Sequence, residues 1–515
     1  MRIQQRGRRI IRFVLTRREF HAAAAPAILT GRGAGKPPNL LFLIADDHAA
    51  YVMGCDGDRA ALTPNLDRLA REGARFASHY CNSPVCTPSR QSLLTGQMPH
   101  AAGVTVLRTP LDPSRPTLAK QLKKAGYETA VFGKMHFNRP ASPGLHGFDH
   151  PMTEGEVTRA WQQQVKPAPV DPSIPVKTLP WRPFRTPARE WLNAGALPYP
   201  RHDKDMRGTF IVREAMRFLE EKRDKPFALW VSLLEPHSPF DFPVEDRGRF
   251  DPRRFEPPPV GPEDGWQIPL IFRDLTREDK QGIQAAYYTS VHFLDRNFGR
   301  VLAKLRELRL EEDTLVVYTA DHGYCLGHHG RFEKHCGYDP ALRVPLIARW
   351  PGRIEPATVT DFTEHLDLGP AILEMLGAPP FEVQHGRSLA PYLRGRRPEK
   401  PRDHIVSEYP ENEEVFVRTR RWKLIYCSGR RRRQDGYETD NPTPGRHVRL
   451  FDLEADAGEF RNVARQHPRV VVDLEKLALE RMRATHPEAA REPSAGSVED
   501  RLDFYLPPRD ARPQA

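Results

Sequence analysis

Short apolar segments alternate with amphipathic segments along most of the chain. The run from Leu40 to Ile44 is apolar throughout and leads into Asp46 and Asp47, a pattern typical of a buried strand. "TPNLDRLAREG" follows with Thr63 as a helix N-cap, a proline in the first turn and a terminal glycine. The same order recurs in "TLAKQLKKAGYETAVFGK" and "FALWVSLLEPH", and in "TLVVYTADHG" after an amphipathic segment at 278–309. This alternation predicts an α/β fold, with a large, mostly parallel sheet flanked by helices on both faces.

The chain is too long for one ordinary core, so we expect a second, smaller unit. Residues 38–400 carry the alternating pattern and form the predicted main domain. Within it, residues 164–200 are proline-rich and weakly periodic, which favours an insertion or lid over another layer of the core. Residues 401–515 contain short strand-like segments such as "EEVFVRTRRWKLIYCS", which predict a small C-terminal α+β subdomain and a tail.

The formal net charge is +11, but much of the excess lies in a basic leader at 1–37 and in "GRRRRQ" at 429–434. Neither run forms a stripe of alternating basic and aromatic residues, so the sequence does not indicate a nucleic-acid-binding protein. No apolar run reaches the ~18 residues that span a bilayer, so we do not expect an integral membrane protein. In the leader, "TRREF" at 16–20 precedes a run of small residues and resembles a twin-arginine export signal. With such a signal the protein is periplasmic or secreted; otherwise it is cytoplasmic.

Polar side chains follow four of the predicted strands, at the point where each strand ends. In open parallel sheets, reactive groups collect beyond the carboxyl ends of the strands, so we expect these side chains to converge. They are Asp46 and Asp47, Lys134 and His136, His237, and Asp321 and His322. The six cysteines form no CxxC pair and indicate neither a disulfide framework nor a cysteine zinc site.

The stretch "SPVCTPSRQSLLTG" places Cys86 and Arg90 where a turn gives way to a helix-like run. Two interpretations of these residues alone stay open. Cys86 is either a catalytic thiolate that faces an anion, or a buried structural cysteine at a helix start. A phosphatase loop of the tyrosine-phosphatase kind fits poorly, because only three residues separate the cysteine from the arginine and no glycine lies between them.

The wider context of this stretch resembles the sulfatase family. "CTPSRQSLLTG" is similar to the family signature, Cys-x-Pro-x-Arg followed by a short helix and Thr-Gly, in which the cysteine is oxidised to formylglycine. Further segments resemble sulfatase blocks in family order, among them "NLLFLIADDHAAYVMGCDG", "VFGKMHF", "EPHSPF", "TADHGYCLGHHGRFEKHCGYDPALRVPLIARWPG" and "VRLFDLEADAGEFRNV". The resemblance covers roughly residues 38–465 and implies an alkaline-phosphatase-like α/β fold.

The resemblance also implies one divalent cation. Asp46, Asp47, Asp321 and His322 would hold it, together with an oxygen of formylglycine at position 86. Mostly hard oxygen ligands suit calcium first, and magnesium as well. Many sulfatases carry Asn where this chain has His322, and an imidazole ligand suits manganese or zinc better than it suits calcium.

Further roles are implied residue by residue. Lys134 would bind a sulfate oxygen, and His136 would bond the formylglycine hydrate and help to expel sulfate. His237 and Lys334 match positions on the leaving-group side, where His237 would act as the general acid. Arg90 would hydrogen-bond the formylglycine hydrate and hold the loop, and its always-charged guanidinium suits this role better than a lysine. We expect the neighbouring histidines of the "GHHGRFEKHC" segment, His328, His329 and His335, to be exposed loop residues.

The sequence thus predicts a sulfuric ester hydrolase that cleaves a sulfate monoester, of a sulfated carbohydrate or a small organosulfate. A formylglycine-generating enzyme is the expected maturation partner of Cys86. Two alternatives stay open: a phosphonate monoester or phosphodiester hydrolase with the same site, and a non-catalytic binder of sulfated glycans. Nothing in the sequence indicates an oligomeric state.

Overall fold

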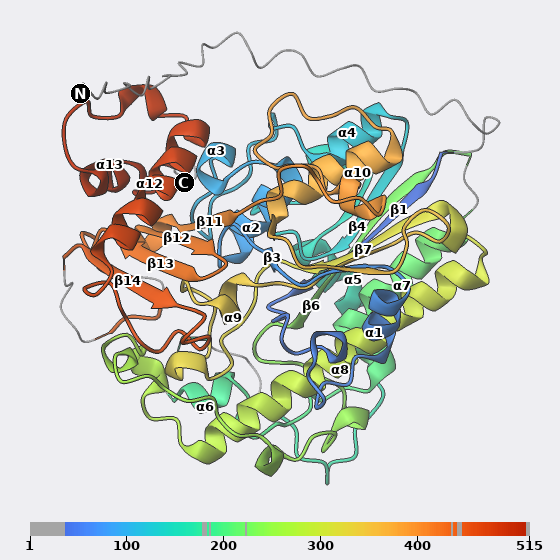
Figure 1. The fold of residues 1–515 in the computed structure, drawn as a ribbon. Helices are drawn as coiled ribbons and strands as arrows, with labels where there is room; N and C mark the ends of the chain where they lie inside the picture. Colours follow the sequence, from blue (N-terminus) through green and yellow to red (C-terminus); the bar gives the residue numbers. More distant parts are fainter. Residues whose placement is uncertain are drawn as a thin grey trace, which may run out of the picture. The chain divides into compact units, whose positions relative to one another are not determined.

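An eight-stranded sheet forms the centre of the computed structural model, in the order β5-β4-β6-β1-β7-β8-β2-β9 (Figure 1). Its strands are β1 (Asn39–Asp46), β2 (Ala74–Phe76), β4 (Glu128–Gly133), β5 (His150–Met152), β6 (Phe227–Pro236), β7 (Thr314–Ala320), β8 (Leu346–Arg349) and β9 (Ala357–Val359). The first five strands in this order are parallel, and β8 runs antiparallel to β7 and β2. The prediction of a mostly parallel sheet is therefore confirmed.

The structure describes residues 37–177, 183–184, 187–221, 224–433, 436–439 and 445–510. The predicted basic leader, up to residue 36, lies outside the described residues. So do residues 178–182 and 185–186 of the predicted insertion. In the described part of the chain, no helix is long and apolar enough to cross a membrane.

Helices cover both faces of the sheet. The side chains of β1 point alternately to the two faces, and each face carries an apolar cluster on which helices pack. Leu41 and Leu43 belong to the cluster on one face, and Leu40 and Phe42 belong to the cluster on the other. The first face is covered by α1 (Pro64–Arg71), α5 (Glu154–Gln164), α7 (Arg207–Glu220) and α8 (Arg277–Glu307). The second face is covered by α2 (Cys86–Thr95), α4 (Leu118–Lys124) and α10 (Leu368–Leu376).

The start of α1 is capped from outside the helix. Thr63 occupies the N-cap position, as predicted, but its side chain makes no capping bond to the helix backbone. The buried Asp295 carboxylate on α8 instead accepts hydrogen bonds from the backbone amides of Asn65 and Leu66, at 3.1 and 2.8 Å. The free backbone amides at the start of α1 are therefore hydrogen-bonded to a residue 230 positions away in the sequence, and not to a neighbouring side chain.

A separate antiparallel sheet follows the main sheet in sequence. It contains β11 (His404–Tyr409), β12 (Glu414–Thr419), β13 (Trp422–Cys427) and β14 (His447–Asp452), in that order. Leu474 and Leu479 of α12 (Pro468–Thr485) and Leu502 of α13 (Val498–Tyr505) pack on Val406, Val415 and Leu424 of this sheet. The shorter elements are β3 (His79–Tyr80), β10 (Thr363–Glu364), α3 (Pro99–Ala102), α6 (Ala188–Trp191), α9 (Asp339–Leu342), α11 (Ala390–Leu393) and several 3-10 turns.

Candidate active site

The polar ends of neighbouring strands meet at the carboxyl edge of the sheet. Asp46 is the last residue of β1, which lies between β6 and β7. The strand β6 leads to His237, and β7 leads to Asp321. Asp47 adopts a left-handed backbone with φ of 66°, and its amide donates to Asp321 Oδ1 at 3.1 Å. The topology of the sheet therefore positions these side chains, as the sequence predicts.

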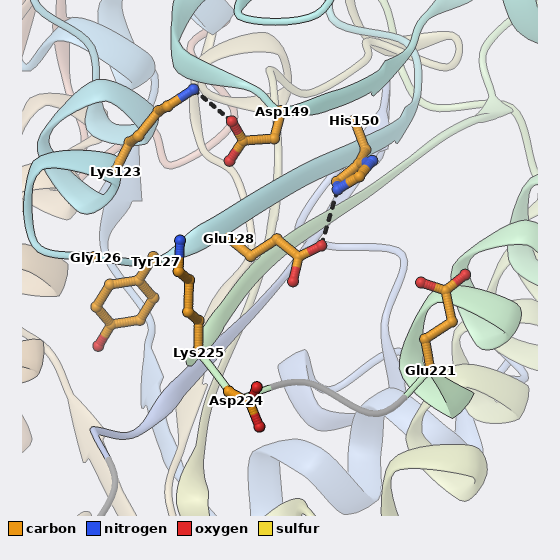
Figure 2. A pocket seen from close by; sticks show the side chains of 9 residues that line it. All are labelled: Lys123, Gly126, Tyr127, Glu128, Asp149, His150, Glu221, Asp224 and Lys225. Atoms are coloured by element: carbon orange, nitrogen blue, oxygen red, sulfur yellow. Dashed lines mark hydrogen bonds and ion pairs between the residues drawn. The ribbon is translucent and has the colours of Figure 1, made fainter.

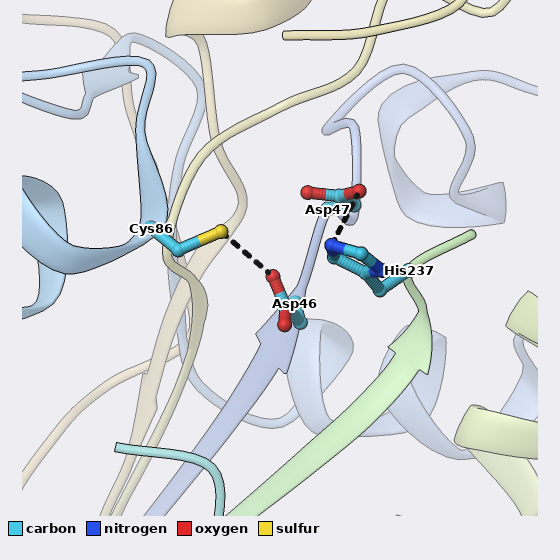
Figure 3. Close-up of side chains that lie close together, drawn as sticks. All are labelled: Asp46, Asp47, Cys86 and His237. Carbon is cyan, nitrogen blue, oxygen red and sulfur yellow. Dashed lines mark hydrogen bonds and ion pairs between the residues drawn. The ribbon is translucent and has the colours of Figure 1, made fainter. Parts of the chain in front are cut away.

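Cys86 is the first residue of α2 and is fully buried among charged groups. Its Sγ lies 3.1 Å from His322 Nε2, 3.5 Å from Asp46 Oδ1 and 3.6 Å from Lys134 Nζ. Figure 3 shows the Cys86 side chain directed at Asp46. Burial alone would raise the pKa of this thiol, but the charges of Lys134, Lys334 and His322 hold that pKa well below its usual range. The environment favours an anion at this position.

Arg90 lies one turn further along α2 and donates hydrogen bonds to several groups of the centre. Its Nε donates to Asp321 Oδ2 at 2.8 Å, while Nη1 donates to the Lys134 carbonyl at 2.6 Å and to Ser232 Oγ at 2.9 Å. Nη2 lies 3.9 Å from Asp46 Oδ2. The planar guanidinium thus connects three strand ends, which a single ammonium group cannot do.

Three basic side chains lie around Asp47 on the other side of the centre. Lys334 Nζ donates to its two carboxylate oxygens at 2.7 and 3.0 Å. His322 Nδ1 lies 3.3 Å from Oδ1, and His237 Nε2 lies 3.9 Å from Oδ2, the pair drawn in Figure 3. Although burial favours the neutral imidazole, Asp321 and Cys86 raise the pKa of His322 to about 9.

His136 lies at the end of β4, where the backbone turns. Its φ of 56° is in the left-handed region, and Gln91 Nε2 donates to its carbonyl at 3.1 Å. A hydrogen bond from the His136 ring also lowers the pKa of Cys86. Among the described residues, its buried Nδ1 has no hydrogen-bond partner. The ring therefore faces the cysteine and keeps one nitrogen available.

The donor atoms at this centre converge closely enough to bind one metal ion. Two groups have ligand atoms that lie within 4.8 Å of one another: Asp46, Asp47, Cys86 and His237, and Asp46, Cys86, Asp321 and His322. The three carboxylates, Asp46, Asp47 and Asp321, are fully buried. Such a set of buried oxygen donors fits a divalent cation of the calcium or magnesium type.

Comparison with known proteins identifies the family. Residues 38–378 match the family model described as Sulfatase, and residues 327–485 match one described as N-sulphoglucosamine sulphohydrolase, C-terminal. The chain belongs to the sulfatase family. This sulfatase is 30% identical to choline-sulfatase of Rhizobium meliloti over 490 residues, covering 87% of this chain and 86% of the relative. It is 27% identical to human arylsulfatase A over 505 residues, covering 88% and 89%. The family makes the chain a sulfuric ester hydrolase.

Solved structures confirm the alkaline-phosphatase-like fold. Phosphonate monoester hydrolase from Silicibacter pomeroyi superposes with a TM-score of 0.73 at 26% identity, covering 89% of this chain and 98% of that structure. The enzyme of Agrobacterium radiobacter also gives a TM-score of 0.73, at 23% identity, covering 88% and 97%. At 23% identity, the similarity to the Agrobacterium radiobacter enzyme supports the fold alone.

The structure corrects the prediction for two histidines of this sulfatase. His329 and His335 are 2% and 4% exposed, so they are not exposed loop residues. The His329 ring stacks on Tyr338 with centroids 3.5 Å apart, and its Nδ1 bonds the Asp264 carboxylate. His335 packs against Tyr409. Partners distant in sequence bury these rings, while His328 is half-buried.

Sequence reasoning also missed a residue of the centre. Ser232 accepts from Arg90 and donates to the Lys134 carbonyl. It is a single polar residue in the otherwise apolar centre of "FALWVSLLEP", and that isolated position is the only local signal for it.

The opposite end of the sheet carries a different hollow, of about 550 Å³ (Figure 2). Its lining contains charges of both signs that pair with one another. Lys123 bonds Asp149, and His150 Nε2 lies 2.8 Å from Glu128 Oε1. Glu128 begins β4, so this hollow lies at the amino edge of the sheet, away from Cys86. It is not part of the candidate active site.

Proposed function

We propose that this sulfatase hydrolyses the sulfate monoester of a sulfated carbohydrate or a small organosulfate, through a formylglycine hydrate made from Cys86. The observation that carries the proposal is the position of Cys86 Sγ within 3.6 Å of Asp46, Lys134 and His322. The substrate class is supported by the names of two relatives, the choline-sulfatase and an N-acetylglucosamine-6-O-sulfatase of Bacteroides thetaiotaomicron, 28% identical over 486 residues.

In the proposed first step, one hydroxyl of the hydrate at position 86 loses its proton to Asp321, which has an oxygen within 4.8 Å of Cys86 Sγ, and attacks sulfur. The bond between sulfur and the ester oxygen breaks, and the alcohol leaves with a proton from His237, the general acid. His237 is partly exposed, with 17% of its side chain accessible, which suits a group that meets the leaving alcohol. Lys134 and Lys334 face the centre and would stabilise the charge that develops on the sulfate oxygens.

In the proposed second step, the remaining hydroxyl loses its proton to His136. The carbon–oxygen bond to the covalent sulfate then breaks, which regenerates the aldehyde and releases sulfate. The unpartnered Nδ1 of His136 and its ring contact with position 86 support this role. Arg90 would keep the loop in place through its contacts to Asp321 and Ser232.

We assign the metal position to Asp46, Asp47, Asp321 and His322, with calcium as the proposed ion. The carboxylate oxygens suit calcium, and the imidazole of His322 also admits manganese. When bound, the cation withdraws charge from the sulfate group and orients the nucleophile. The experiment is metal analysis of protein purified without added metal, and a metal other than calcium at one equivalent would contradict the assignment.

The formylglycine proposal is tested by mass spectrometry of the peptide "FASHYCNSPVCTPSR", which trypsin releases as residues 76–90. We expect residue 86 as the aldehyde in protein from a host with a formylglycine-generating enzyme, the proposed maturation partner. Cys81, in the same peptide, is buried beside the Ala341 carbonyl and is an internal control that stays a thiol. An unmodified Cys86 in active enzyme would contradict the mechanism.

A second candidate activity is hydrolysis of phosphonate monoesters or phosphodiesters at the same site. The 26% identity and TM-score of 0.73 to a phosphonate monoester hydrolase favour it. Steady-state rates on an aryl sulfate and the matching aryl phosphonate separate the two. A higher kcat/KM for the phosphonate would replace our first proposal.

We also propose that the chain is exported, on the basis of "TRREF" in the leader. A fusion of the leader to a reporter that matures only after folding would reach the periplasm. Replacement of Arg17 and Arg18 by lysine would abolish that transport. Transport that survives this replacement would contradict the proposal.

A further inference from the structure

A cavity of about 820 Å³ lies between the loop that follows α3 and the end of the chain. Figure 1 shows α3 beside the C-terminal helix α12, and His100 of α3 bonds Thr485 of α12 at 2.8 Å. The residues used below that line the cavity are Thr105, Thr109, Asp112, Arg115, Arg139 and Asp510.

Asp510 occupies a cradle of four hydrogen-bond donors in this cavity. Its carboxylate accepts from the Thr105 amide at 2.6 Å, the Thr105 hydroxyl at 2.7 Å, the Val106 amide at 3.0 Å and the Thr109 hydroxyl at 2.6 Å. All four donors are neutral, and together they satisfy both carboxylate oxygens. Paired backbone amides of this kind bind anionic oxygens in general, so the cradle is not specific to a carboxylate.

The same loop is bonded to the reaction centre. The Leu107 carbonyl accepts from Thr87 Oγ1 at 2.6 Å and from Asn138 Nδ2 at 3.0 Å. Thr87 follows Cys86 directly, and Asn138 is two residues beyond His136. The cradle therefore belongs to the immediate surroundings of the proposed nucleophile.

Three arginines also line the cavity: Arg115, Arg139 and Arg509. Among the residues that the structure describes, neither Arg115 nor Arg139 forms an ion pair within 4 Å. The acids in the lining are Asp112, which is exposed and bonded to Ser114, Glu488, which pairs with Arg491, and Asp510 in the cradle. Two free guanidinium groups beside an anion cradle give the cavity the chemistry of an anion site.

We propose that this cavity is an anion subsite, which binds a second sulfate group of a polysulfated carbohydrate while the first is hydrolysed at position 86. Asp510 occupies the cradle in the free enzyme, and the second sulfate replaces it. A sulfate ester is ionised at all physiological pH values and accepts from amide, hydroxyl and guanidinium donors alike. The inference rests on the proposed function and narrows its substrate class to carbohydrates with more than one sulfate.

The contacts that hold Asp510 can be exchanged for contacts to another anion. All four donors of the cradle are neutral amides or hydroxyls, so no ion pair has to break when the carboxylate leaves. By contrast, the guanidinium groups of Arg115 and Arg139 offer an incoming sulfate charged donors that Asp510 does not contact.

The test is calorimetric binding of sucrose octasulfate to the folded full-length enzyme, which requires no turnover. We expect Arg139→Ala and Arg115→Ala to raise Kd about threefold to tenfold each, the usual range for a partly exposed charged contact. Arg108→Ala is the matched control, since Arg108 is exposed on the same loop but does not line the cavity. It should change Kd by less than about twofold.

The cradle is tested with Asp510→Asn, which weakens the competing carboxylate and should lower Kd severalfold. Asp112→Asn removes the same charge from the cavity lining but not from the cradle, and should have a smaller effect. Inorganic sulfate inhibition should be equal in all variants, because it reports the reaction centre. An unchanged Kd in Arg139→Ala, or equal effects of Asp510→Asn and Asp112→Asn, would overturn the subsite. Absence of sulfatase turnover with normal octasulfate binding would instead count against the proposed function.

Discussion

Replacement of Arg90 by lysine is a sharp test of how the reaction centre is held together. Arg90 is 1% exposed and makes three hydrogen bonds of 2.6 to 2.9 Å, to Asp321, the Lys134 carbonyl and Ser232. A lysine ammonium reaching the same place can keep the contact with Asp321, but its single nitrogen cannot also serve the other two acceptors. The variant therefore loses about two buried hydrogen bonds while the net charge stays constant.

A hydrogen bond from a charged donor contributes about 1–3 kcal/mol, so the loss of two lowers the folding free energy by about 2–6 kcal/mol. The entropy of unfolding of a chain of this size is about 1 kcal/mol per kelvin, from about 2 cal/mol per kelvin per residue. The Tm of Arg90→Lys should consequently fall by about 2–6 °C. We also expect kcat to fall about 100-fold, because the strand ends that carry Lys134 and Asp321 are no longer hydrogen-bonded to the same side chain.

Differential scanning calorimetry at neutral pH measures the effect, with Arg75→Lys as the control. Arg75 makes one ion pair, to Asp56 at 2.8 Å, and 21% of its side chain is exposed. That exposed contact contributes about 0–1 kcal/mol, so its Tm should change by less than about 1 °C. Equal Tm values for the two variants, or an Arg90→Lys enzyme with normal kcat, would refute the argument that the planar fork holds the centre.

Three further predictions concern single residues. Lys134→Met removes the ammonium that contacts Asp46. We therefore expect calorimetry to show calcium binding that is about tenfold tighter, together with a lower kcat/KM. Weaker calcium binding would contradict this prediction. Burial lowers the pKa of His146 to about 4, so the stability this neutral ring contributes is fully present above pH 6.5 and is lost as pH falls towards 4. His146→Asn, which tolerates the φ of 50°, should lose less stability between pH 7 and pH 5 in urea unfolding than the wild type. Asp295→Ala leaves the first amides of α1 without acceptors and should cost about 2–4 kcal/mol with an unchanged KM; a neutral effect on stability would contradict the capping role.

The sequence predicted the parts of the site that depend on local patterns. A buried apolar run followed by Asp46 and Asp47 identifies both a strand and its carboxyl end, and the parallel topology then brings several such ends together. For Asp46 and Asp47, the strand pattern and the rule for parallel sheets were sufficient. The local pattern around Cys86 left two interpretations open, and only the resemblance to the sulfatase family implied its role.

Contacts between distant segments were beyond the reach of sequence patterns. The cap of α1 by Asp295 and the cradle of Asp510 join residues 230 and 405 positions apart. The burial of His329 depends on Tyr338 and Asp264, and the latter lies 65 positions away. Periodicity reports which face of an element is apolar, but it does not report which side chain of another element lies opposite.

Lys134 and Lys334 do not by themselves give the reaction centre a net positive charge that would attract an anion. Each cationic side chain is already matched by a carboxylate: Lys134 by Asp46, Lys334 by Asp47, and Arg90 by Asp321. With a neutral formylglycine hydrate at position 86, these three pairs sum to zero charge. A divalent cation held by Asp46 and Asp47 would take their oxygens from Lys134 and Lys334, and the two ammonium groups would then be available to the sulfate ester. Under the proposed mechanism, attraction for the anionic substrate would therefore depend on whether these carboxylates hold the cation.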